Sequence, residues 1–226
     1  MSGHRRKRAD KMVNAMKRIL CFGDSNTWGN ISGTPDRFDP EVRWTGVLQR
    51  RLGDGYLVIE EGYNGRTVVM PDLVEGRLSG IDYFRPCLDS QSPLDLVILM
   101  LGTNDLKVRF GLEAESIAFS FGRYLDALKT TPMMGDRPKV LLISPILIDE
   151  SYKGNALFHG MFGEDGVSRS RALAPAYQRF AQENGLEFMD AAQYAAASPV
   201  DGIHMAAADH ERLGLAVAER VRGIIG

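Results

Sequence analysis

Five residues of this 226-residue chain have the types and neighbours that nucleophilic acyl transfer needs: Ser25, Gly65, Asn104, Asp201 and His204. A serine hydroxyl becomes a competent nucleophile only beside a general base, and histidine, which titrates near neutral pH, is the usual base. An aspartate three positions before the histidine can hold the imidazole in one tautomer and stabilise its charged form. We therefore predict that Ser25, His204 and Asp201 act as nucleophile, base and orienting carboxylate.

The other two residues suit the charge that develops during acyl transfer, because a tetrahedral intermediate needs hydrogen-bond donors that are already in place. The backbone N–H of Ser25 lies at an expected helix start, where amides are unpaired. Gly65 lets the backbone come close to a substrate, and the side-chain amide of Asn104 is a neutral donor. We predict that these three groups form an oxyanion hole.

Each of these residues also has a purely structural interpretation when it is considered alone. Serine and asparagine cap helices, glycine and aspartate form turns, and a lone histidine is most often a surface or capping residue. The functional interpretation therefore depends on whether the chain brings all of them to one place.

Short apolar runs predict the strands that have to position these residues. Residues 19–22 precede Ser25, and the continuous apolar run 94–101, typical of a strand covered on both faces, precedes Asn104. Further strands are expected at residues 56–59, 140–143 and 186–189. Parallel strands end at one edge of the sheet, where open α/β sheets bind their ligands, so residues far apart in the sequence can meet there.

Apolar residues at helical spacing predict helices between the strands, at residues 44–52, 79–89, 113–129, 168–184 and 207–224. The segment 149–166 contains four glycines and no clean periodicity, and we interpret it as the longest insertion. Strands that alternate with helices imply an α/β fold in which helices cover both faces of a mostly parallel sheet.

The charge balance and the cysteine count narrow the partners and the location. A net charge of −2 does not favour nucleic acid or an anionic membrane as partner, and no apolar run is long enough to span a bilayer. Two cysteines, Cys21 and Cys87, suit a reducing compartment better than a disulfide scaffold. We expect no nucleic acid, no membrane and a cytoplasmic location.

Basic residues crowd the amino end before the first expected strand. Such a run is either an arm for a polyanion or a solvated extension, and short charge runs favour the second interpretation. We predict a disordered basic extension at residues 1–16 and a single domain at residues 17–226.

Four blocks of the sequence resemble the signatures of the SGNH hydrolase superfamily, also called GDSL esterases: GDSN, the glycine of YNGRT, GTND and DGIH. Longer stretches resemble its bacterial arylesterase branch, which is noted for acyltransferase and perhydrolase activity: ILCFGDSNTWG, RWTGVL, VIEEG, LDLVILMLGTND and VDGIH. The resemblance implies a flavodoxin-like three-layer sandwich with five parallel strands, no metal and no cofactor. Asn26 stands where a leucine gives the family its name, and we expect no catalytic consequence.

The resemblance also implies the activity. We expect a serine esterase that hydrolyses small-acyl, acetyl-type esters through an acyl-enzyme, with water or an alcohol as acyl acceptor and with acyltransferase or perhydrolase activity as an extension. Trp28, Phe158 and Phe162 are the expected substrate-binding residues. The insertion 149–166 is expected to build the mouth of the site and part of a homo-oligomer contact.

Two other functions compete with this one. A metal-dependent deacetylase would use Asp201, His204, His210 and His159 as ligands, although only His204 has a matched partner. A catalytically silent carbohydrate- or lipid-binding module would keep the fold without the chemistry. The motifs G-x-S-x-G of α/β-hydrolases and G-x-x-x-x-G-K-[ST] of phosphate-binding NTPases are both absent from the sequence.

Overall fold

Five strands form one parallel sheet in a computed structural model that describes residues 16–133 and 135–226, so most of the predicted basic extension lies outside the described residues. Their order is β2-β1-β3-β4-β5, which is flavodoxin-like. The predicted parallel sheet is thereby confirmed. The strands are β1 Lys17–Gly23, β2 Tyr56–Gly62, β3 Leu96–Met100, β4 Lys139–Ser144 and β5 Glu187–Asp190.

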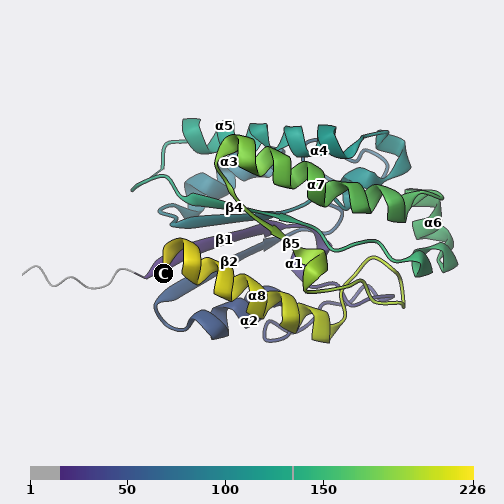
Figure 1. The fold of residues 1–226 in the computed structure, drawn as a ribbon, viewed down its shortest axis with the longest axis horizontal. Coiled ribbons are helices and arrows are strands. Elements are labelled where there is room, and N and C mark those ends of the chain that lie inside the picture. The colour runs from purple at the N-terminus through teal and green to yellow at the C-terminus, as the bar shows by residue number, and fades with distance from the viewer. Residues whose placement is uncertain (1–15, 134) are drawn as a thin grey trace, which may run out of the picture.

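Alternate residues of the central strands feed two separate cores, because successive side chains of a strand point to opposite faces. Leu20 and Phe22 of β1 pack in one core, whereas Ile19 and Cys21 pack in the other. Helices α3, α4, α5 and α7 cover the first face, and α2 and α8 cover the second (Figure 1). The predicted three-layer arrangement is therefore confirmed.

Most of the helices lie where their spacing predicts them. The helices are α1 Ser25–Trp28, α2 Trp44–Leu52, α3 Gly80–Gln91, α4 Ala114–Ser120, α5 Gly122–Thr130, α6 Ala156–Phe162, α7 Gly166–Asn184 and α8 Ala207–Ile225. The single helix predicted at 113–129 is wrong in one respect, since the chain breaks it at Phe121 into α4 and α5. Gly122 follows the break, and glycine is a poor former of helix interiors.

Strand β2 is longer than predicted and runs on to Gly62, which pairs with Gly23 of β1. The extra residues include Glu60 and Glu61, which do not look like strand residues. Strand β2 lies at one edge of the sheet, and Arg37 and Arg43 contact Glu60 Oε1 there at 2.5 and 2.7 Å. These contacts offset the cost of a carboxylate in the sheet.

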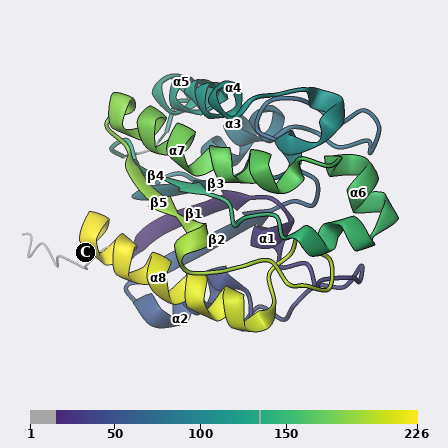
Figure 2. The ribbon, with the colours of Figure 1, turned by 45° about the vertical axis from the view of Figure 1, so that its right-hand side comes forward.

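The insertion 149–166 is ordered into a 3₁₀ turn, Glu150–Gly154, and helix α6. Asn155 caps α6, since its side chain accepts the backbone N–H groups of Leu157 and Phe158. Figure 2 shows α6 at the right-hand side of the molecule, beyond α1. Gly202 joins the insertion to the loop of Asp201, because its carbonyl accepts the Asp149 N–H at 2.9 Å.

The described residues contain no helix that combines the length and the apolar character needed to cross a bilayer. Both cysteines are buried and unpaired. Burial raises the pKa of the thiols of Cys21 and Cys87, the latter to about 12, so both behave as inert apolar side chains.

Candidate active site

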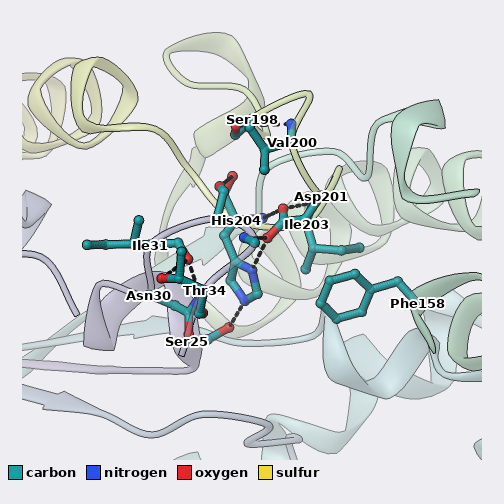
Figure 3. Close-up of polar contacts among 12 residues, drawn as sticks. Ser25, Asn30, Ile31, Thr34, Phe158, Ser198, Val200, Asp201, Ile203 and His204 are labelled. Atoms are coloured by element: carbon teal, nitrogen blue, oxygen red, sulfur yellow. Dashed lines mark hydrogen bonds and ion pairs between the residues drawn. The ribbon is translucent and has the colours of Figure 1, made fainter. Parts of the chain in front are cut away.

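Ser25, His204 and Asp201 meet at the carboxyl edge of the sheet in a single line of contacts (Figure 3). His204 Nε2 lies 3.0 Å from Ser25 Oγ, and His204 Nδ1 lies 2.8 Å from Asp201 Oδ2. Ser25 begins α1 directly after β1, and the other two residues lie in the loop before α8. The structure thus brings the predicted nucleophile, base and carboxylate together.

The Asp201 carboxylate accepts four hydrogen bonds. Oδ1 accepts the backbone N–H groups of Ile203 and His204, both at 2.9 Å, and Oδ2 accepts the imidazole and the backbone N–H of Gly33 at 3.0 Å. Burial by itself raises the pKa of Asp201, but the imidazole and the backbone donors outweigh burial and lower it. An ionised carboxylate only accepts, so the proton sits on His204 Nδ1 and Nε2 is free to accept from Ser25.

A tight turn between β1 and α1 presents Ser25. A Cβ on Gly23 would lie 2.9 Å from the Met100 carbonyl oxygen, so the turn requires glycine. The Asp24 carboxylate accepts the Asn26 N–H at 3.0 Å and caps the helix. Burial raises the pKa of Asp24 to about 6, against the lowering by that backbone donor.

The loop that follows α1 also contacts the residues of the site, which the sequence analysis did not predict. Ser32 Oγ donates to the His204 carbonyl at 3.1 Å, and the Gly33 N–H reaches Asp201. Figure 3 also shows Asn30, Ile31 and Thr34, which hydrogen-bond to one another in this loop. The contacts of Ser32 and Gly33 join segments far apart in the chain through one hydroxyl and one backbone amide, so no local sequence pattern predicts them.

Asn104 and Gly65 lie next to each other at the ends of β3 and β2. Asn104 Nδ2 donates to the carbonyl of Arg66 at 3.2 Å, which places the amide against the turn that contains Gly65. Gly65 has a φ of +77°, a conformation that favours glycine. Among the described residues, neither the Gly65 N–H nor the Ser25 N–H donates a hydrogen bond, so both remain available to an oxyanion.

A buried charge connects this turn to the end of β1, just before Ser25. Arg66 Nη1 donates to the Gly23 carbonyl at 2.8 Å, and its guanidinium lies 4.1 Å from the centre of the Phe22 ring. Both oxygens of Asp105 accept the Val68 N–H, at 2.9 and 3.0 Å. Burial raises the pKa of Asp105 to about 7, so this carboxyl titrates close to neutral pH.

The three expected substrate-binding residues lie in different surroundings. The Phe158 ring lies 6.0 Å from the His204 ring, centre to centre (Figure 3). Trp28 is half-buried beneath the Arg37 guanidinium, 4.8 Å from its ring centre. The prediction is wrong for Phe162, because this side chain is 2% exposed and packs edge-on against Tyr152 in the core. Phe162 is therefore a core residue and not a substrate-binding residue.

Of the four residues named for a metal site, Asp201 and His204 are in contact, but His159 and His210 make other contacts. His159 pairs with Glu164 on the surface at 2.9 Å, whereas His210 is fully buried and its Nδ1 accepts the Trp44 N–H at 3.3 Å. Burial lowers the pKa of His210 to about 4, which keeps it neutral. The part of the chain that the structure describes contains no group of three His, Cys, Asp or Glu side chains able to hold a metal ion.

The sequence and the fold are both similar to those of known esterases. Residues 21–212 match the model of the GDSL-like lipase/acylhydrolase family. An aryl esterase of M. smegmatis is 40% identical with a TM-score of 0.87, and the carbohydrate acetylesterase Est24 from Sinorhizobium meliloti is 39% identical with a TM-score of 0.87; each alignment covers 92% of this chain and 100% of the other. A putative arylesterase from Agrobacterium tumefaciens str. C58 is 35% identical with a TM-score of 0.82, covering 93% of this chain and 100% of that one. No curated protein matches the sequence.

Proposed function

Since the chain belongs to the GDSL-like lipase/acylhydrolase family, we propose that Ser25, His204 and Asp201 are the catalytic triad with which it hydrolyses esters. The family makes the protein a carboxylic ester hydrolase, whose substrate is an ester and whose acyl acceptor is water. The residue assignment rests on one observation, the contacts of 3.0 and 2.8 Å that connect Ser25 through His204 to Asp201.

In the proposed mechanism, Ser25 Oγ attacks the acyl carbon while His204 Nε2 takes the hydroxyl proton. Asp201 stabilises the imidazolium that forms. His204 then returns the proton to the leaving alcohol, which departs and leaves the acyl group on Ser25. In the second half, His204 takes a proton from water, the resulting hydroxyl attacks the acyl carbon, and Ser25 Oγ leaves with that proton.

We propose that the Asn104 amide and the N–H groups of Ser25 and Gly65 stabilise the oxyanion. Asn104→Ala is expected to lower kcat by roughly 10²–10³ with a smaller change in KM, because the donor acts mainly on charge that develops in the transition state. Asn104→Asp is expected to be worse, since a carboxylate would face the oxyanion. Steady-state rates with p-nitrophenyl acetate measure both effects.

One kinetic outcome would contradict the proposed role of Asn104. A higher KM with unchanged kcat would make Asn104 a residue for ground-state binding and remove it from the oxyanion hole. The Asn104 amide also bonds the Arg66 carbonyl, so a thermal melt of each variant shows whether the turn still folds.

We infer a preference for small acyl groups. The Phe158 ring lies 6.0 Å from the His204 ring, centre to centre, and we propose that it limits the length of the acyl chain beside Ser25. The relatives described as an aryl esterase and a carbohydrate acetylesterase support acetyl esters of phenols or sugars as substrates. We further propose that an alcohol or hydrogen peroxide can replace water in accepting the acyl group, as the sequence resemblance implies.

The proposed preference is tested with p-nitrophenyl acetate, butyrate and octanoate. The wild type is expected to show its highest kcat/KM on acetate, and Phe158→Ala is expected to raise the octanoate-to-acetate ratio because it opens space beside His204. Phe119→Ala is the control, since Phe119 is 81% exposed on α4. A ratio that Phe158→Ala leaves unchanged contradicts the role of Phe158, and acetylated sugars assayed alongside identify the leaving alcohol.

The homo-oligomer and the cytoplasmic location stay predictions. The insertion offers less apolar surface to a partner than its sequence suggests, because Phe158, Met161 and Phe162 pack against the domain's own core. Leu157 remains 62% exposed on α6 and is the residue of the insertion that suits a contact between copies.

A further inference from the structure

The side chain of Asn26 holds the backbone on both sides of His204. Its Nδ2 donates to the Ile203 carbonyl at 3.2 Å, and its Oδ1 accepts the Met205 N–H at 2.9 Å. The side chain is buried, since the residue is only 4% exposed. One amide therefore spans the residue whose imidazole faces Ser25, using both its donor and its acceptor.

Asn26 is also the covalent neighbour of the nucleophile. Ser25 and Asn26 are the first two residues of α1, a single turn held by the Asp24 cap at its start and by the Gly29 N–H, which donates to the Ser25 carbonyl at 2.8 Å. Because this turn is held at both ends, a group fixed to the Asn26 amide is fixed relative to Ser25. The distance from Ser25 Oγ to His204 Nε2 is thus set over a very short path.

Asp201 cannot do this task, although it contacts the same imidazole. It lies three positions before His204 in the same loop, and its bonds to the imidazole and to the His204 N–H stay within that loop. Its bond with the Gly33 N–H reaches the loop after α1 and not α1 itself. Ser32 holds the His204 carbonyl from a third segment. Asn26 alone among these contacts links the histidine loop directly to the helix that carries the nucleophile.

We propose that Asn26 is a positioning residue that holds His204 at hydrogen-bond distance from Ser25, an inference that rests on the proposed esterase function. The expectation that Asn26 has no catalytic consequence is thereby revised. A leucine at this position could fill space but could neither donate to Ile203 nor accept from Met205. A catalytic group displaced by about 1 Å loses roughly 10² in rate, which gives the scale of the effect.

The test compares variants on two adjacent residues of α1. Asn26→Ala removes both bonds, and the isosteric Asn26→Asp keeps the acceptor for Met205 but turns an oxygen toward the Ile203 carbonyl. Thr27→Val is the matched control, because Thr27 is fully buried and its Oγ1 has no hydrogen-bond partner among the described residues. Rates are measured with p-nitrophenyl acetate, and titration of Ser25 with an organophosphonate counts the folded sites.

Per titrated site, Asn26→Ala and Asn26→Asp are expected to lower kcat about 10- to 100-fold with KM within about threefold, whereas Thr27→Val keeps the wild-type kcat. A merely structural role would reduce the melting temperature or the number of titrated sites without this loss in kcat, and that outcome overturns the proposal. If Asn26→Ala does not fold, Asn26→Asp decides by the same criterion.

Failure of this proposal is distinct from failure of the proposed function. If Ser25→Ala is inactive but both Asn26 variants turn over like Thr27→Val, only the positioning role of Asn26 is wrong. If Ser25→Ala itself turns over normally, the triad is wrong and Asn26 has no histidine to position.

Discussion

Replacing Ser25 by alanine is expected to abolish ester hydrolysis and leave the fold intact. The proposed attack uses one oxygen, and the loss of such a nucleophile costs on the order of 10⁴–10⁶ in kcat. Among the described residues, the side-chain oxygen of Ser25 contacts only His204, so little stability depends on it. Initial rates with p-nitrophenyl acetate measure the loss, and thermal melts check the fold.

The control for this variant is a serine outside the site. Ser168 lies on the surface of α7, where its Oγ donates to the Asp165 carbonyl at 3.0 Å, and Ser168→Ala is expected to keep the wild-type rate. Near-normal turnover by Ser25→Ala would contradict the proposed mechanism. An organophosphonate that labels the wild type but not Ser25→Ala would identify the nucleophile independently.

Asp201→Asn is expected to reduce kcat/KM by roughly 10⁴, the scale seen when a triad carboxylate becomes an amide. The asparagine amide would donate to His204 Nδ1 and force the imidazole proton onto Nε2, which could then no longer accept from Ser25. Asp36→Asn changes the net charge equally at an exposed position and serves as the control. Rates on p-nitrophenyl acetate at neutral pH decide, and a loss below tenfold contradicts the role of Asp201.

The same substitution is expected to make the free energy of unfolding depend less on pH in the acid range. The pKa of Asp201 is lowered in the folded protein, so its ionised form stabilises the fold above its ordinary pKa, and this contribution is lost as the pH falls through the folded value. Asp201→Asn removes the titration. Urea unfolding of the wild type and of Asp201→Asn, each at neutral and at acid pH, measures how much the free energy of unfolding of each protein changes with pH.

The proposed catalytic residues could be placed together from the sequence because each belongs to a short motif at a strand end or in the loops of that edge. Apolar runs located β1 and β3, and parallel strands share a carboxyl edge, so Ser25 and Asn104 had to lie on the same side of the sheet. The spacing of Asp201 and His204 then allowed the carboxylate to reach the imidazole. Residue type, local spacing and sheet geometry together were sufficient.

The roles of Phe158 and Phe162 were not separable in the same way. Both are phenylalanines of one short helix, four positions apart, in a segment without clear periodicity. Packing against Tyr152 decided that Phe162 is a core residue, while Phe158 stays beside His204. The direction of each side chain depended on where α6 docks, which the segment's own residues do not specify.

By itself, the sequence determined which segments become buried strands and which residue types stand after them, because apolar runs must leave water and each motif carries its own donors and acceptors. Only the tertiary structure decided how the residues of the proposed triad are held in place. Asn26 bonds residues 177 and 179 positions away, and Gly33 bonds Asp201 across 168 positions. Such hydrogen bonds form between surfaces that packing brings together, so the local sequence around either partner does not specify them.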